Sequence, residues 1–194
     1  MNAERRAIAD ELLAAARAHD AAHSDRLARF RNVEPETAEL LGVVVRATRA
    51  RRVLELGTSN GYSTIWLADA VEATGGALTS VEIDPARTAL ARANLDRAGL
   101  TAELVTGDAA EALRASGDGA WDVVFLDAER SAYAGYWPEL LRVLRPDGGL
   151  VAIDNVLSHA AEVAAVTALI AAEPAVTSAL VPVGAGVRLV ARSR

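Results

Sequence analysis

Two carboxylates and a carboxamide follow two apolar segments of strand length. Asp127 comes directly after residues 121–126, and Asp154 and Asn155 come directly after residues 150–153. If these segments are neighbouring parallel strands, the three side chains meet at one edge of the sheet. Carboxylate and amide oxygens suit a hard divalent cation that keeps several waters and accepts substrate oxygens. The alternative is that one acid caps a helix and the other is solvated.

A glycine-containing turn follows the first apolar segment, residues 52–56. It reads Gly-Thr-Ser-Asn-Gly from Gly57 to Gly61 and leads into a predicted helix. Glycine lets a ligand approach the main chain, and the free N–H groups of the helix point to the same place. Ser59 stands where a dinucleotide motif has its middle glycine, and the chain has no lysine to bind phosphate. The turn therefore suits a nucleoside without a pyrophosphate, with a plain tight turn as the alternative.

Acids also follow the next two apolar segments. Glu82 lies about 20 to 30 residues past the glycine turn, where an acid can hold the two hydroxyls of a ribose. We expect Glu82 to bind the ribose and Asp84 to cap the helix that follows it. Asp108 and Ala109, after the third segment, are expected beside the nucleobase.

Strand-length apolar segments alternate with helix-length segments from residue 50 onward. The predicted strands are residues 52–56, 78–83, 102–105, 121–126, 150–153, 178–183 and 187–191. The predicted helices are residues 3–17, 37–48, 63–72, 85–98, 109–115, 133–144 and 159–172. This alternation predicts an α/β fold with a Rossmann-like, doubly wound, seven-stranded sheet that is mostly parallel. Only residues 184–186 join the last two strands, so these form a hairpin that makes one strand antiparallel.

The composition narrows the class of protein. The chain has 194 residues, of which 52% are hydrophobic and 24% charged. We expect one domain over residues 1–194, with N-terminal helices over 1–48 and a Rossmann-like core over 50–194. The net charge of −6 argues against nucleic-acid and anionic-membrane partners. The absence of cysteine and lysine excludes disulfides, thiolate sites, Schiff-base enzymes and P-loop NTPases.

The first residues are charged and amphipathic and do not resemble a signal peptide, so we expect a cytoplasmic protein. The apolar positions Ile8, Leu12 and Leu13 share one face of the first predicted helix. That face can pack on a second copy in a homodimer, or it can cover the chain's own sheet.

These motifs resemble the class I S-adenosylmethionine (SAM)-dependent methyltransferases, and specifically the cation-dependent O-methyltransferases of the catechol and caffeoyl-coenzyme A type. The resemblance runs from about Val33 to Arg192. It rests on residues 54–63, residues 127–133, the pair Asp154-Asn155 and the hairpin residues 182–186. Many methyltransferases share the glycine motif, whereas its combination with Asp154-Asn155 is more specific.

The resemblance implies a role for each matching position. Asp127 and Arg130 would act in catalysis, and the acceptor would be a small phenol with two vicinal oxygens. A divalent cation (Mg²⁺, Mn²⁺ or Ca²⁺) would be bound by Asp127, Asp154 and Asn155. The cofactor SAM would be contacted by Val33, Glu55, Gly57, Thr58, Gly61, Ser63, Glu82, Asp108, Ala109, Asp127 and Glu129.

The chain departs from the resembled family at Arg130, where relatives commonly have a lysine that acts as general base. Arginine keeps its proton, so Arg130 can stabilise a phenolate but cannot easily accept its proton. A surface charge is the alternative for Arg130. His159 is a second candidate base, with helix capping and exposure as the alternative. The segment after Asn155 runs almost at once into a predicted helix and the N-terminal segment is short, so we expect an open acceptor site.

Two other functions stay open. One is a SAM methyltransferase that uses no metal and acts on another small acceptor. The other is a SAM-binding protein without catalysis. An NAD-linked oxidoreductase is a more distant alternative.

Overall fold

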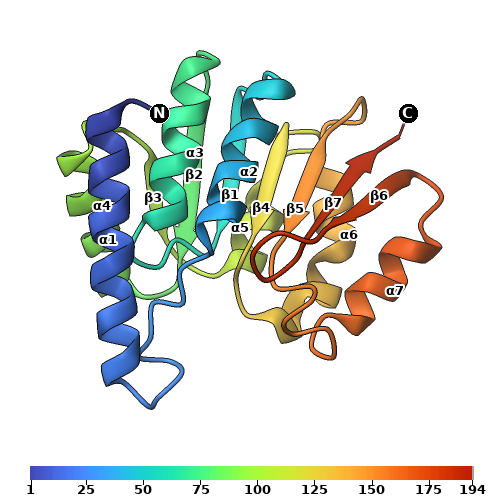
Figure 1. Ribbon diagram of the computed structural model, residues 1–194. Helices are drawn as coiled ribbons and strands as arrows, with labels where there is room; N and C mark the ends of the chain where they lie inside the picture. Colours follow the sequence, from blue (N-terminus) through green and yellow to red (C-terminus); the bar gives the residue numbers. More distant parts are fainter. Residues whose placement is uncertain (194) are drawn as a thin grey trace.

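Seven strands form one sheet in the computed structural model, which describes residues 1–193. Their order across the sheet is β3-β2-β1-β4-β5-β7-β6 (Figure 1). In this sheet β7 runs opposite to the other six strands. The strands are β1 (Arg52–Leu56), β2 (Ala77–Glu82), β3 (Glu103–Thr106), β4 (Val123–Leu126), β5 (Leu150–Ile153), β6 (Val176–Val181) and β7 (Val187–Arg192). The predicted Rossmann-like sheet with one antiparallel strand from the C-terminal hairpin is confirmed.

Helices cover both faces of the sheet (Figure 1). One face packs against α1 (Ala3–Ala22), α2 (Pro35–Ala47), α3 (Tyr62–Ala73) and α4 (Pro85–Arg97). The other face packs against α5 (Ala109–Ala115), α6 (Tyr133–Val143) and α7 (Ala164–Ala172), and a 3₁₀ turn, η1 (Arg130–Ala132), precedes α6. Successive residues of β4 point to opposite cores: Val123 and Phe125 into the first, Val124 and Leu126 into the second. This two-sided burial explains why the central strands are continuous apolar runs.

The register of the sheet brings the predicted site residues to one level. The last residues of β1, β4 and β5 pair side by side. The residues that come next, Gly57, Asp127 and Asp154, therefore leave the sheet together. Asn155 follows with a φ of 67°, in the left-handed region that asparagine tolerates better than most residues.

The prediction of a helix starting at His159 is wrong. Residues 156–163 form turns, and α7 begins only at Ala164. The N–H groups of Val156, Leu157 and Ser158 donate to carbonyls of the β6–β7 turn, at Gly186 and Ala185. This hairpin holds the segment out of helical geometry. A turn-rich segment of eight residues therefore follows Asn155, contrary to expectation.

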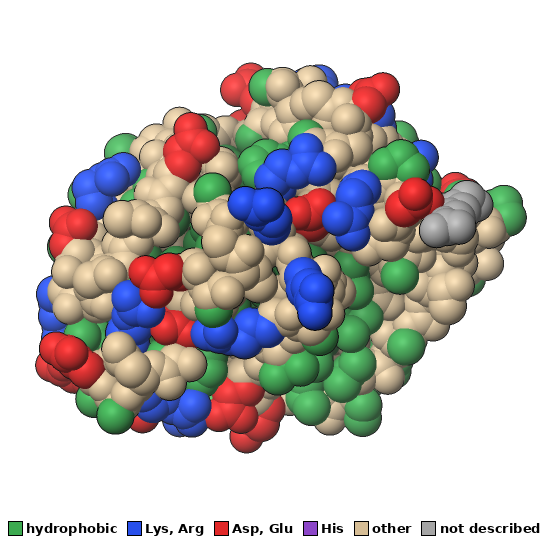
Figure 2. All heavy atoms as spheres, turned by 90° about the horizontal axis from the view of Figure 1, so that it is seen from above, with side chains coloured by type: hydrophobic (Ala, Val, Ile, Leu, Met, Phe, Trp, Pro, Cys, Tyr) green, Lys and Arg blue, Asp and Glu red, His purple; other side chains and the backbone are tan. Residues whose placement is uncertain are grey.

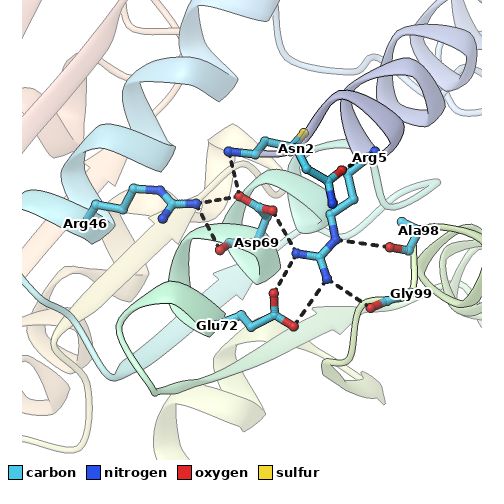
Figure 3. Close-up of polar contacts among 8 residues, drawn as sticks. Asn2, Arg5, Arg46, Asp69, Glu72, Ala98 and Gly99 are labelled. Atoms are coloured by element: carbon cyan, nitrogen blue, oxygen red, sulfur yellow. Dashed lines mark hydrogen bonds and ion pairs between the residues drawn. The ribbon is translucent and has the colours of Figure 1, made fainter.

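A charged cluster attaches α1 to the rest of the first face (Figure 3). The carboxylate of Asp69, on α3, accepts hydrogen bonds from Arg5 (2.9 Å) and Arg46 (2.5 Å), and lies 3.2 Å from the N-terminal ammonium. Arg5 also donates to Glu72 and to the carbonyls of residues 98 and 99. Leu12 and Leu13 of α1 are buried in the first core. The apolar face of α1 therefore packs against α3 in the chain's own core, and a homodimer remains a prediction.

Figure 2 shows the end of the sheet opposite the carboxyl ends of the parallel strands, where arginines and acids lie interspersed. Asp122 is paired there with Arg52 and Arg145. Such mixed charge does not make the basic surface that nucleic acid requires. Within residues 1–193, every helix is too short or too polar to cross a membrane.

Candidate functional site

A cavity of about 630 Å³ opens at the carboxyl ends of the parallel strands. Its volume lies within the roughly 300–1,000 Å³ typical of small-molecule sites. The walls come from the strand ends, from the link between α1 and α2, and from the segment after Asn155. Nine residues predicted at the site line it: Val33, Gly57, Glu82, Ala109, Asp127, Glu129, Arg130, Asp154 and Asn155.

The other predicted SAM contacts lie behind this lining. The carboxylate of Glu55 is fully buried and accepts hydrogen bonds from the hydroxyls of Ser63 (2.5 Å), Thr64 (2.6 Å) and Ser80 (2.6 Å). The Thr58 hydroxyl bonds that of Ser80. These side chains hydrogen-bond to one another behind the glycine turn and hold its shape. Their direct contact with SAM stays a prediction.

Asp108 and Gly61 have structural tasks that are visible in the fold. Asp108 caps α5, because its carboxylate accepts hydrogen bonds from the N–H groups of Ala110 (2.9 Å) and Glu111 (3.1 Å). Gly61 begins α3 with a φ of 88° and lies against the backbone of Ala91. Both residues lie outside the cavity lining, and their contacts with SAM also stay predictions.

Burial raises the pKa of Glu55 to about 7, although three hydroxyls donate to the carboxylate. The folded state therefore binds the proton of the Glu55 carboxyl more tightly than the unfolded state does. The free energy of unfolding thus falls as pH rises from about 5 to 7 and is constant above that. A rise from 4.5 to about 7 corresponds to about 3 kcal/mol. Because glutamine does not ionise, Glu55→Gln should lack this fall. We expect its free energy of unfolding, measured with urea, to rise by about 3 kcal/mol relative to that of wild type between pH 5 and pH 8. A difference between the two proteins that does not change with pH would contradict this.

Glu82 connects the glycine turn to the end of β2. Its carboxylate accepts hydrogen bonds from the N–H groups of Ser59 (2.7 Å) and Asp84 (3.0 Å) and also lines the cavity. The carboxylate of Asp84 accepts a hydrogen bond from the N–H of Ala86 (2.8 Å). Asp84 is therefore the predicted helix cap, which leaves Glu82 as the acid available to a ligand hydroxyl.

Asp127 and Asp154 meet in the cavity, and Asn155 connects them. The Asn155 amide nitrogen donates to Asp127 (3.0 Å) and to Asp154 (3.2 Å). Burial raises the pKa of Asp154 to about 6. Burial and the neighbouring negative charge of Asp154 raise the pKa of Asp127 well above its usual range. The raised pKa values show that two negative charges are unfavourable at this site, so the pair favours a bound proton or a bound cation.

The donor set fits a hard divalent cation. Oδ1 of Asp154 is buried and has no hydrogen-bond partner within residues 1–193. A half-turn of the Asn155 amide would present its oxygen in place of its nitrogen, and the two are interchangeable in shape. The described chain holds no cluster of three or more His, Cys, Asp or Glu, so water or substrate oxygens would complete a six-fold shell around a cation here.

Arg130 is a buried residue of the cavity wall, so the surface-charge alternative is wrong. It is 5% exposed, and its Nε donates to the carboxylate of Glu162 at 2.8 Å. His159 also lines the cavity, and its Nδ1 lies 2.8 Å from the Ser158 hydroxyl. Because α7 begins at Ala164, helix capping does not account for His159.

The link between α1 and α2 contributes lining residues that the sequence analysis missed. Besides Val33, the cavity is lined there by Arg26, Leu27, Arg29, Phe30, Arg31, Asn32 and Glu34. Arg26 forms an ion pair with Glu129 at the cavity wall, with N···O 3.0 Å. The N-terminal segment is therefore long enough to wall the site. Three arginines within six residues are the only sequence signal for it.

Comparison with known proteins identifies relatives. A family model described as O-methyltransferase matches residues 4–193. A catechol O-methyltransferase of Niastella koreensis is 40% identical over 131 residues, covering 65% of this chain and 58% of that protein. A catechol O-methyltransferase of Mycobacterium tuberculosis is 38% identical over 148 residues, covering 75% of this chain and 64% of that protein. Both matches thus span less than two thirds of the relative's length.

The fold also matches a solved structure. The O-methyltransferase of Bacillus cereus, in complex with S-adenosylhomocysteine (SAH), superposes with a TM-score of 0.80 at 27% identity. The match covers 96% of this chain and 91% of that one.

Proposed function

Because this chain belongs to the O-methyltransferase family, we propose that it moves the methyl group of SAM to one hydroxyl of a small vicinal diphenol with the help of a divalent cation. The observation that carries the proposal is the pair Asp127 and Asp154 in the cavity wall, where one carboxylate oxygen of the buried Asp154 has no hydrogen-bond partner within residues 1–193. The names of the two catechol O-methyltransferases support the acceptor class. The SAH complex of the Bacillus cereus relative supports the cofactor.

The cofactor would occupy the half of the cavity nearest β1 and β2. Glu82 would accept hydrogen bonds from the ribose hydroxyls, as an acid at this strand end does in related folds. Gly57 lines this half of the cavity, and the methionine part would lie against its main chain. Val33 and Ala109 would provide apolar walls, and Glu129 lies near enough to the cavity to meet the cofactor amine.

The acceptor would lie against Asp127, Asp154 and Asn155. A divalent cation held by these residues would stabilise the phenolate of the acceptor and orient its two oxygens. In this proposal Arg130 would add a positive charge to the same wall, and His159, which also lines the cavity, would accept the hydroxyl proton. As the bond from the methyl carbon to the phenolate oxygen forms, the bond to sulfur breaks. The sulfur keeps the electron pair, which leaves SAH.

A metal-independent methyltransferase is the second candidate. It is favoured by the hydrogen bonds that Asn155 donates to both carboxylates, which hold the pair together without a cation. In that case Asp127 and Asp154 would orient another small acceptor.

Removal of divalent cations separates the two candidates. We expect methylation of catechol by SAM to fall at least about 100-fold after exhaustive chelation and to return on addition of Mg²⁺, since charge stabilisation of several kcal/mol is lost. Product would be measured as monomethylated catechol and as SAH in equal amounts. The monomethyl ether of catechol, which lacks the second free hydroxyl, is the control acceptor and should react far more slowly. Full activity in the chelated enzyme would favour the metal-independent candidate.

Cation binding should depend on pH. The pKa of Asp154 is raised to about 6, so this carboxyl holds a proton below about pH 6, and a cation must displace it. We expect Mn²⁺ affinity to be constant near pH 8 and to weaken about tenfold for each pH unit below 6 per proton displaced. Calorimetry in buffers of different ionisation enthalpy would count the released protons. An affinity that does not change between pH 5 and pH 8 would contradict the assignment.

A further inference from the structure

Five arginines line the cavity, and four of them are paired through their side chains. Arg26 binds Glu129, and Arg130 binds Glu162. Arg29 donates to the carbonyl of His23, and Arg87 donates to the carbonyls of residues 27 and 29. The side chain of Arg31 has no hydrogen bond or ion pair with any residue of the described chain, 1–193. Its guanidinium is therefore free to bind an anion that enters the cavity.

The backbone of Arg31 is held in an unusual conformation. Its φ is +54°, in the left-handed region that residues other than glycine seldom adopt. The carboxylate of Asp20, at the end of α1, accepts hydrogen bonds from the N–H groups of Phe30 (2.7 Å) and Arg31 (2.8 Å). Asp20 thus fixes the turn that directs the side chain of Arg31 to the cavity. Such constrained backbone positions concentrate at functional sites.

Arg31 and Asp127 line the same cavity, and their charges act on each other. Burial and the positive charge of Arg26 lower the pKa of Arg31, and the negative charge of Asp127 opposes them. The charge of Arg31 acts in turn on the pKa of Asp127. Arg31 and Asp127 are therefore close enough to interact, although the structure shows no direct contact between them.

The link that carries Arg31 continues to the β6–β7 turn. Glu34, three residues further on, lies against Gly184 of that turn, and the same turn holds the segment after Asn155. The free guanidinium of Arg31 therefore lines the same cavity as the residues expected to hold the acceptor.

We propose that Arg31 binds a carboxylate carried by the acceptor, so that the preferred acceptors are vicinal diphenols with an acidic side group. A planar guanidinium matches a carboxylate through two parallel hydrogen bonds. This inference rests on the proposed function and adds to it the chemical class of the acceptor.

The test compares catechol with 3,4-dihydroxybenzoate in wild type, Arg31→Gln and Arg31→Lys. We expect wild type to have a kcat/KM at least about 10-fold higher for 3,4-dihydroxybenzoate. Arg31→Gln should lower that value about 30-fold, as expected for a lost bond to a charged group, and change the value for catechol less than about threefold. Arg31→Lys should restore part of the preference because it restores the charge. The matched control Arg29→Gln removes another arginine of the same wall and should keep the preference.

Three results would overturn the inference. An equal loss of kcat/KM for both acceptors in Arg31→Gln would mean that Arg31 acts on the reacting hydroxyls or on the charge of the whole site, and not on a carboxylate of the acceptor. A large loss of SAH affinity in Arg31→Gln would assign it to the cofactor carboxylate. An unchanged preference would leave Arg31 without a role in acceptor choice.

Failure of the proposed function is a separate outcome. If wild type methylates neither acceptor, the proposed function fails. Calorimetric binding of the two acceptors to SAH-loaded protein then decides the inference. A preference for 3,4-dihydroxybenzoate that Arg31→Gln removes supports it, and equal affinities in wild type overturn it.

Discussion

Asp154→Asn is expected to abolish methyl transfer and to leave the protein folded. The substitution keeps the size of a side chain that is 2% exposed, but it removes one of the two carboxylates expected to bind a cation. We expect kcat/KM for catechol to fall at least about 1,000-fold, because several kcal/mol of charge stabilisation in the transition state disappears. The asparagine should not destabilise the protein at pH 8. The pKa of the wild-type Asp154 carboxyl is raised to about 6, so at pH 8 the group is ionised although its buried surroundings disfavour the charge.

This pair of effects distinguishes a functional carboxylate from a structural one. Activity should be lost while the melting temperature at pH 8 stays equal or rises. Asp118→Asn is the matched control, because Asp118 is 83% exposed and, within residues 1–193, its side chain pairs with Arg142 alone. Its activity should stay within about twofold of wild type, as for most surface substitutions. An Asp154→Asn protein with near-normal activity would refute the role of the carboxylate pair.

Gly57→Ala is expected to destabilise the protein and to destroy the cofactor site. Gly57 has a φ of +105°, and a Cβ there would collide with the carbonyl oxygen of Asp127. The ends of β1 and β4 would have to move apart, and both carry site residues. Since strained backbone alone costs of order 1–3 kcal/mol and the collision adds to it, we expect a loss of at least about 3 kcal/mol.

The control for Gly57→Ala is Gly99→Ala. Gly99 also has a positive φ, +60°, but a Cβ there would meet no atom within 4 Å. This variant should lose only about 1 kcal/mol, the strain of the left-handed region, and should bind SAH normally. Urea unfolding and SAH titration measure both quantities. Similar losses in the two variants would show that the contact with Asp127 does not matter.

The sequence was sufficient to predict the sheet because its signals are local. The central strands are buried on both faces, so each is a continuous apolar run whose end marks the edge of the sheet. Gly57, Glu82, Asp127 and Asp154 were predicted at that edge for the same reason. The start of α7 was missed because it is set by hydrogen bonds between residues 156–158 and the distant β6–β7 turn. The spacing of apolar residues along a predicted helix does not reveal such a contact with a distant part of the chain.

The remaining site residues come from segments that only the folded chain brings together. Glu162 reaches Arg130 from the turns before α7, and Arg26 reaches Glu129 from the link after α1. Arg31 depends on Asp20, eleven residues earlier, for its backbone conformation. In the sequence these residues look like ordinary solvated charges, because their partners cannot be read from spacing.

The most direct measurement is a titration of Mn²⁺ into SAH-loaded protein at pH 8, followed by paramagnetic resonance, for wild type and Asp154→Asn. We predict one tight site per chain in wild type and its loss in the variant, which still binds SAH. The absence of a tight site in wild type, with or without catechol present, or equal binding by both proteins, would contradict a cation held by Asp127, Asp154 and Asn155.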